Sequence, residues 1–232
     1  MRTGQAMGIY DLAVHAIRSL YSERISTPPV LDADAVFPAA RRFATAWPEI
    51  REEAMSLARQ LGEVPRFHDV MREQAEISAN DGRDWRVFLL KVYGVNVAKH
   101  MAACPRLAEL VASEPDVISA TLSFLAPHKH IPRHRGPFKG VLRFQLGVSV
   151  PLAEDGRPAS VLAIEDVEYR IGDGDYLLWD DTYAHEVWNR SNEMRVALLL
   201  DVRRRNMPIG LTLFSRFLIA TIGLTARLRG LA

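Results

Sequence analysis

Two of the seven histidines, His134 and His185, stand where their side chains could hold a metal ion. Each lies beside a turn at the end of a predicted strand, within one β-rich stretch of the chain. The mouth of a β-barrel is a frequent place for small-molecule and metal sites. Imidazole binds iron, zinc, copper and nickel alike, so the pair predicts a metal site without choosing the metal. The neighbouring His128 and His130 are expected to have structural roles.

Short strands must position this pair. From residue 117 onward, runs of branched and aromatic residues alternate with turns rich in Gly, Pro and Asp. Strands are predicted over residues 117–126, 140–150, 159–164, 166–171, 175–180, 184–188 and 194–202. This spacing is typical of a sandwich or barrel, and we expect a cupin-like jelly roll, the double-stranded β-helix.

Helices are predicted on both sides of the β unit. Helical periodicity covers residues 5–22, 35–61 and 103–113, and Pro48 is expected to divide the second stretch and begin a new helix. A further strand is expected over 85–93. The fold class is therefore mainly β with flanking helices. We divide the chain into an N-terminal helical region packed on the core, a jelly-roll domain and an apolar C-terminal helix, over 1–84, 85–205 and 206–232.

Charge and cysteine content narrow the function classes. The 29 Lys and Arg residues against 28 Asp and Glu give a net charge of +1, which offers no electrostatic basis for binding nucleic acid. The single cysteine, Cys104, can form no intramolecular disulfide and suits a reducing compartment. Residues 1–20 lack the apolar core of a signal peptide. We therefore expect a cytoplasmic protein.

The segment 209–229 is apolar but is interrupted by Arg216 and ends in Arg227 and Arg229. A helix of this kind can pack on the domain. The alternative is a peripheral membrane contact, in which the helix lies in the lipid interface with a basic flank. The sequence leaves both open, and it does not indicate an oligomeric state.

Two longer motifs surround the histidines. Residues 130–137 read HIPRHRGP and are followed by LRFQLG at 142–147. Residues 174–188 read GDYLLWDDTYAHEVW and are followed by RVALLLDV at 195–202. In this order, and over roughly residues 85–205, they resemble the aspartyl/asparaginyl β-hydroxylase family.

The resemblance implies a jelly-roll dioxygenase that uses Fe(II), 2-oxoglutarate and O2 and releases succinate and carbon dioxide. By matching position, His134 and His185 are the implied iron ligands. Arg195, ten residues after His185, is implied to pair with the far carboxylate of 2-oxoglutarate. The planar guanidinium fork of arginine suits such a bidentate contact.

Four more residues are implied at the cosubstrate. Ser123 and Arg143 match family residues that face it, Gln145 stands where some relatives carry a histidine, and Trp85 opens a segment similar to one that lines the pocket in relatives. Core packing is an equally good explanation for Trp85. Alternation along strands places Arg143 and Gln145 on one face, so polar side chains share one side of the expected sheet.

The motif departs from the usual facial triad of two histidines and a carboxylate. The carboxylate normally stands two residues after the first histidine, and here that residue is Gly136. The resembled family shares this lack, and we expect water to complete the site. The nearby Asp180, Asp181 and Glu186 are expected to be structural or to contact the ligands rather than the metal.

The family name implies Asp or Asn side chains in peptides as substrates, and a related branch hydroxylates the acyl chain of lipid A. A small molecule is also compatible, and Arg133, Arg135 and Lys139 would suit an anionic substrate or a solvated loop. One rival class is a non-catalytic cupin-like binding module, although such a module has no need for both histidines and Arg195. Another is a metal-dependent isomerase or hydrolase, whose zinc site usually takes three protein ligands.

Overall fold

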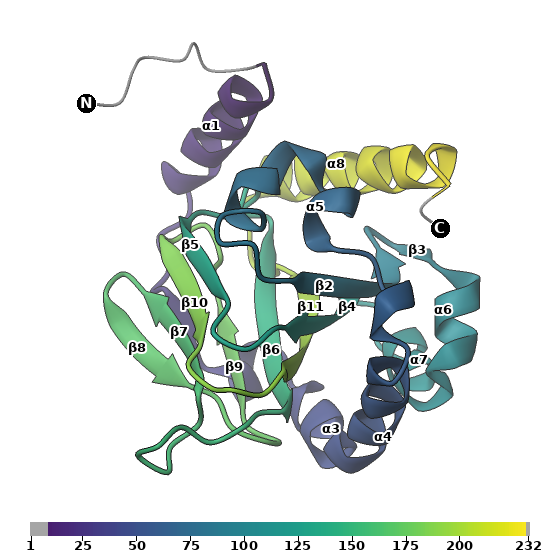
Figure 1. Ribbon diagram of the computed structural model, residues 1–232. Helices are drawn as coiled ribbons and strands as arrows, with labels where there is room; N and C mark the ends of the chain where they lie inside the picture. The colour runs from purple at the N-terminus through teal and green to yellow at the C-terminus, as the bar shows by residue number, and fades with distance from the viewer. Residues whose placement is uncertain (1–8, 231–232) are drawn as a thin grey trace.

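The computed structural model describes residues 9–230, with side chains from residue 12 onward (Figure 1). The longer helices are α1 (Ile9–Ser22), α4 (Trp47–Ala58), α7 (Pro105–Ala112) and α8 (Ile209–Leu228). The shorter ones are α2 (Ala33–Val36), α3 (Ala40–Thr45), η1 (Leu61–Glu63), α5 (Phe67–Val70), η2 (Arg72–Ile77) and α6 (Ala98–Ala103).

Two antiparallel sheets form the centre of the molecule. The large sheet has the order β1 (Val30–Leu31), β9 (Tyr176–Trp179), β6 (Val141–Ser149), β11 (Arg195–Arg203), β4 (Val117–Leu125), β2 (Trp85–Val92) and β3 (Val95–Asn96). The small sheet has the order β5 (His130–His134), β10 (His185–Asn189), β7 (Ser160–Ile164) and β8 (Val167–Arg170). Facing antiparallel sheets of this order confirm the expected jelly roll.

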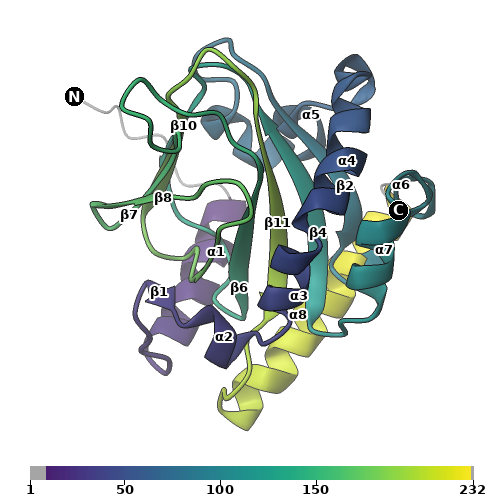
Figure 2. The ribbon, with the colours of Figure 1, turned by 90° about the horizontal axis from the view of Figure 1, so that it is seen from below.

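The central strands of the large sheet are buried on both faces. The outer face carries Phe124, Phe144 and Leu198 against α3, α4 and α7, and Figure 2 shows α3 and α4 on the side of β11 and β4 away from β7 and β8. The inner face packs on the small sheet through a second apolar cluster that includes Trp179 and Val187. A strand that is covered on both faces has a nearly continuous apolar sequence, and residues 196–200 of β11 are an example.

Several sequence predictions for the elements differ from the structure. The helical stretch 35–61 contains three helices rather than two, but the division expected at Pro48 is confirmed, because α4 begins at Trp47 with Pro48 in its first turn. The stretch 130–134 is a strand, β5, where only a turn was expected, because its pairing with β10 overrides a polar sequence with one Pro. Val30 and Leu31 add an edge strand, β1, to the large sheet from inside the predicted helical region. The predicted helix over 5–22 is confirmed from Ile9, and its first residues lie outside the described part.

Candidate active site

His134 and His185 lie directly opposite each other, at the end of β5 and the start of β10. Their ring centroids are 4.1 Å apart. Each Nδ1 lies within hydrogen-bonding distance of a backbone carbonyl two residues earlier, Pro132 at 2.7 Å and Tyr183 at 2.9 Å. Donation from Nδ1 leaves Nε2 with a free lone pair, so these bonds set the tautomer that metal binding requires.

Burial also prepares the two rings as ligands. Desolvation lowers the pKa of His134, and desolvation together with the neighbouring His134 ring lowers the pKa of His185 well below its usual range. Both rings are therefore neutral at pH 7 in this environment. Only a neutral imidazole offers a lone pair to a metal ion.

Gly136 and Asp181 share one space beside the histidines. A Cβ added at residue 136 would collide with the carboxylate of Asp181, and the Gly136 amide donates to the Asp181 backbone carbonyl at 2.6 Å. The carboxylate of Asp181 thus fills the place of the side chain missing after His134. Its Oδ1 is buried and accepts no hydrogen bond from any residue that the structure describes. Burial raises the pKa of Asp181 to about 7.

Arg143, from β6, points to the same end of the site but is already paired. Its Nε donates to Asp201 at 2.7 Å and its Nη2 to Asp181 at 3.2 Å. These two carboxylates raise the pKa of the guanidinium despite its burial. The structure therefore gives Arg143 a part in shaping the site, and its contact with a cosubstrate stays a prediction.

Arg195 has a different environment at the first residue of β11. Its side chain is buried, with 3% of the residue exposed, and its Nε donates to Ser160 Oγ at 2.9 Å. Within residues 9–230 it has no carboxylate partner at ion-pair distance. Desolvation accordingly lowers its pKa to about 10. A buried cation without a counter-ion is costly, so this position fits an anion supplied from outside the chain.

Register places the other predicted residues on the same inner face. Ala197 of β11 lies opposite Ser123 of β4, and Leu199 lies opposite Gln145 of β6, so both polar side chains face the small sheet. Trp85 Nε1 donates to Ser123 Oγ at 3.0 Å. The Trp85 ring also stacks on Phe67 with 3.8 Å between centroids. Trp85 therefore packs in the core, and its contact with a cosubstrate stays a prediction.

One cavity of about 190 Å³ joins part of this set. His134, His185, Arg143 and Trp85 line it, whereas Ser123, Gln145 and Arg195 lie outside its lining. Apolar side chains form most of the remaining wall, from β2 on one side and from α5 and η2 on the other: Phe67, Met71, Ile77, Val87, Leu89 and Val92.

The family model described as aspartyl/asparaginyl β-hydroxylase matches residues 44–205. The chain belongs to the aspartyl/asparaginyl β-hydroxylase family. An ornithine lipid ester-linked acyl 2-hydroxylase from Rhizobium tropici is 35% identical over 178 residues, which are 77% of this chain and 61% of that enzyme. The human aspartyl/asparaginyl β-hydroxylase is 24% identical over 138 residues, 54% of this chain and 18% of the human protein. The chain thus spans less than two thirds of either relative.

Among solved structures, a Pseudomonas putida prolyl-4-hydroxylase is similar with 15% identity and a TM-score of 0.40, over 83% of this chain and all of that one. A predicted oxalate decarboxylase from Thermotoga maritima covers 40% of this chain and 71% of its own length, with 17% identity and a TM-score of 0.30.

The two imidazole donors of this site are compatible with iron, while the described residues contain no group of three His, Cys, Asp or Glu side chains placed to hold a metal ion. Two neutral imidazoles lie side by side, an unsatisfied carboxylate oxygen lies in the space beside them, and a buried arginine without a counter-ion occupies the same interior. Imidazole and carboxylate oxygen are the donors of non-haem iron sites. The sequence motif found the histidines and Arg195, but no sequence signal showed that the Asp181 side chain fills the space at Gly136.

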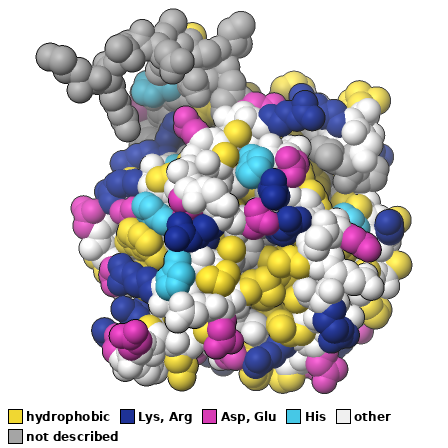
Figure 3. Space-filling model, viewed as in Figure 1, with side chains coloured by type: hydrophobic (Ala, Val, Ile, Leu, Met, Phe, Trp, Pro, Cys, Tyr) yellow, Lys and Arg dark blue, Asp and Glu magenta, His cyan; other side chains and the backbone are white. Residues whose placement is uncertain are grey.

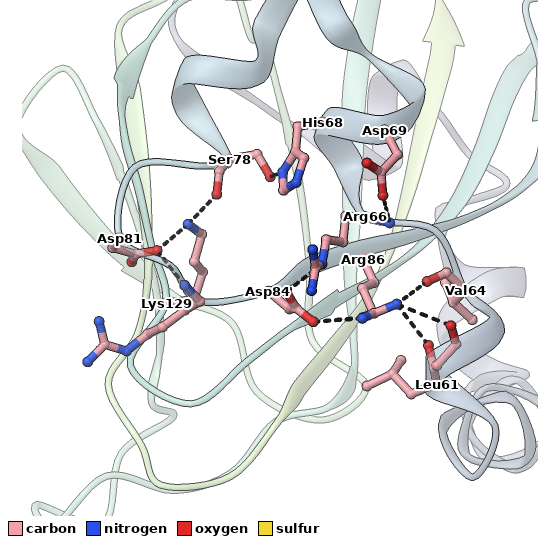
Figure 4. A network of polar contacts seen from close by, with 12 residues as sticks. Leu61, Val64, Arg66, His68, Asp69, Ser78, Asp81, Asp84, Arg86 and Lys129 are labelled. Carbon is pink, nitrogen blue, oxygen red and sulfur yellow. Dashed lines mark hydrogen bonds and ion pairs between the residues drawn. The ribbon is translucent and has the colours of Figure 1, made fainter.

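A polar network joins the segment that follows η2, a helix on one side of the cavity, to the residues next to β5 (Figure 4). The fully buried Lys129, next to β5, donates to the backbone carbonyl of Ser78 at 2.6 Å and to Asn80 Oδ1 at 2.7 Å. It also pairs with Asp81 at 2.5 Å. A buried ammonium with this many acceptors specifies one arrangement, so the segment after η2 is held close to the strand that carries His134.

The remaining charged residues near the histidines have structural partners. Asp180 pairs with Arg204 at 2.6 Å and with Lys139 at 3.0 Å, all inside the protein. His130 lies 3.1 Å from Glu186, and its ring stacks on Trp188. Lys139 is therefore not available to an anionic substrate, and His130 has the structural role expected from the sequence.

Proposed function

We propose that this chain is a hydroxylase that depends on Fe(II), 2-oxoglutarate and O2. The observation that carries the proposal is the combination, in one interior, of the His134–His185 pair and a buried Arg195 with no carboxylate partner in the described chain. A two-histidine site alone suits many metals and reactions. Arg195 adds a binding site for an anion. Such a site suits a dicarboxylate cosubstrate, one end of which binds the metal while the other binds the arginine.

The chain's own residues hold and orient the reactants in this proposal. His134 and His185 hold iron through Nε2, while the carbonyls of Pro132 and Tyr183 fix their rings. Arg195 binds the far carboxylate of 2-oxoglutarate, and the Ser123 hydroxyl, held by Trp85 Nε1, is a further polar contact on the same face. Bound iron supplies the activation of O2 that drives hydroxylation, with conversion of 2-oxoglutarate to succinate and carbon dioxide.

An acyl chain of a lipid is the substrate class that the cavity favours over an Asp or Asn side chain. The basic side chains in its lining are Lys91, Arg135 and Arg143, and each is already engaged. Lys91 donates to the Val117 carbonyl at 2.6 Å, Arg135 lies 3.3 Å from Glu165, and Arg143 pairs with two aspartates. A carboxylate substrate would meet the Asp181 and Asp201 carboxylates, which line the same cavity, whereas its apolar walls accept a hydrocarbon without such repulsion.

The relative from Rhizobium tropici points the same way, because it is named for hydroxylation of a lipid acyl chain. A peptide substrate remains the second candidate, since the human relative carries the aspartyl/asparaginyl name. The two candidates differ in which compound couples succinate release to hydroxylation.

Succinate release from 2-oxoglutarate by iron-loaded protein tests the reaction class. We expect release that requires Fe(II) and O2 together, and that falls by at least about a hundredfold in His185→Ala, as expected when an iron ligand is removed. His128→Ala is the matched control, because His128 contacts Asn192 on the surface. Activity that needs no O2 would support a hydrolase or isomerase instead. The absence of succinate release, combined with no calorimetric binding of 2-oxoglutarate, would support a non-catalytic binding module.

A substrate comparison follows on the same preparation. An acyl lipid and an Asp-containing peptide are each added, and product mass and succinate yield are measured. We expect a product 16 Da heavier from the lipid, since hydroxylation inserts one oxygen atom. Hydroxylation of the peptide alone would overturn the acyl-chain assignment while leaving the reaction class intact.

A further inference from the structure

Helix α8 has apolar side chains on two opposite faces. One face packs on the domain through residues at helical spacing: Leu211, Ser215, Ile219, Gly223 and Ala226. Tyr21 donates to the Leu211 carbonyl at 3.3 Å and its hydroxyl lies 2.7 Å from Ser215 Oγ. Gly223 lies so close to the backbone of β2–β3 that an added Cβ would come within 2.6 Å of the Tyr93 carbonyl oxygen.

The opposite face of α8 is exposed and equally apolar. Leu213, Phe217, Leu224 and Leu228 are 57%, 65%, 58% and 80% exposed. Their spacing of four, seven and four residues puts them on one stripe of the helix. We call these four residues the outer stripe. In Figure 3 hydrophobic side chains lie beside basic ones along the upper edge of the molecule, over α8.

The charges within α8 itself are all positive, and the nearest acidic side chain paired with its end is Glu73, 3.7 Å from Arg229. No Asp or Glu follows Asp201 in the sequence. Arg216 lies three residues after Leu213, and Arg227 three residues after Leu224, so both flank the stripe. Both are exposed, and neither has an ion pair within the described residues. An apolar face with unpaired arginines at its edge complements an anionic lipid surface.

We propose that α8 is an in-plane membrane helix, whose outer stripe docks the protein on an anionic lipid bilayer. By length and composition α8 could cross a membrane. However, its other face covers Tyr21, Ile118 and Phe138 in the cluster beneath it, and lifting the helix into a bilayer would uncover them. A second copy of the chain fits less well, because it would bring the Arg216 and Arg227 pairs of two stripes together.

The position of the cavity relative to α8 bears on how a lipid substrate reaches the histidines. This step rests on the proposed function. Tyr93, whose carbonyl touches Gly223 of α8, also lines the cavity that holds His134 and His185. No residue of α8 lines the cavity, so Tyr93 is the link between the cavity wall and the packed face of the helix. In this proposal, docking brings that wall, and with it the side on which a lipid acyl chain would enter, near the membrane surface.

Vesicle co-sedimentation of the full chain tests the docking itself. We expect binding to vesicles of equal parts phosphatidylglycerol and phosphatidylcholine, and much weaker binding to phosphatidylcholine alone. Phe217→Glu with Leu224→Glu is expected to weaken the partition to anionic vesicles by about tenfold or more, since two anchors become anions. Leu152→Glu is the control, because Leu152 is 64% exposed on the β6–β7 loop, far from α8 in Figures 1 and 2. Circular dichroism establishes that the variants are folded.

Three outcomes would overturn the proposal: no vesicle binding, equal binding by the stripe variant and wild type, or a dimer in sedimentation velocity that Phe217→Glu dissociates. Arg216→Gln with Arg227→Gln should lose the preference for anionic lipid and most of the salt dependence. Succinate release without lipid should be unchanged in all α8 variants. Failed docking is thereby distinguished from a failed reaction class.

Discussion

The buried Arg195 and the half-buried Arg143 lie at opposite ends of the inner face of the large sheet, and their environments differ. Arg143 lies opposite Asp201 at one end of β11 and pairs with Asp201 and Asp181. Arg195, six positions before Asp201 on the same strand, donates to the Ser160 hydroxyl and has no carboxylate partner among residues 9–230. The comparison of the two arginines shows that burial of a cation is not by itself a sign of function. The counter-ion is informative: two aspartates supply it to Arg143, whereas none of the described residues supplies it to Arg195, where we propose an anionic ligand.

The largest effect is expected on stability at the paired end. Arg143→Met leaves the buried Asp181 and the half-buried Asp201 without their cation. Removing one partner of a fully buried pair costs about 3–5 kcal/mol, and we expect a loss near the lower end of this range because the Arg143 side chain is 27% exposed. Urea denaturation with both circular dichroism and fluorescence measures the loss. The triple variant Arg143→Met, Asp181→Asn, Asp201→Asn should recover most of it. A single variant as stable as wild type would mean that the carboxylates do not depend on Arg143.

Substitution of Arg195, which has no carboxylate partner among the described residues, should not lower the stability of the protein. Arg195→Met removes an uncompensated buried charge, so the stability of the ligand-free protein should be unchanged or higher. Binding of 2-oxoglutarate, measured by calorimetry with Mn(II), should weaken by at least about a hundredfold, since a bidentate charged contact is lost. Arg195→Lys keeps the charge without the fork and should lie between the two. If Arg195→Met were as unstable as Arg143→Met, the contrast between the ends would be wrong.

Much of the site could be predicted because it is encoded locally. His134 and His185 lie inside contiguous motifs, and Arg195 begins an apolar run that marks a buried strand. Alternation correctly placed Arg143 and Gln145 on one face, because side chains in a strand alternate whatever the partner strand is.

The missed features depend on contacts between distant segments. Strand β5 exists because β10 pairs with it, and nothing within residues 130–134 signals that pairing. The placement of Asp181 against Gly136 joins residues 45 positions apart. The partners of Arg143 could not be read from its own strand either, since Asp201 comes from β11. The distinction between the two arginines is therefore a tertiary property.

The space that Gly136 and the Asp181 carboxylate share beside His134 can be tested by substitution. Gly136→Ala places a Cβ against the Asp181 carboxylate and should destabilise the protein by about 1–3 kcal/mol, as overpacking does. Asp181→Ala in the same chain removes the obstacle, so the double variant should be more stable than the two single effects predict. Thermal unfolding of all four proteins gives this coupling. Additive effects would show that the space beside His134 is not shared.

The smallest effect is expected between the two ends, at Trp85. Trp85→Phe retains a ring to stack on Phe67 but removes the indole N–H that donates to Ser123 Oγ. One neutral hydrogen bond within the ligand-free protein is worth about 1 kcal/mol, so we expect the stability to fall by about that amount. The Ser123 hydroxyl also loses the bond that orients it, so we expect the affinity for 2-oxoglutarate to fall by up to about fivefold. Ser123→Ala should give a similar fall, and the double variant should be no worse than either single one, because both act through the same hydroxyl. A Trp85→Phe protein that loses stability but binds 2-oxoglutarate normally would assign Trp85 to the core alone. The anion receptor would then consist of Arg195 without support from β2.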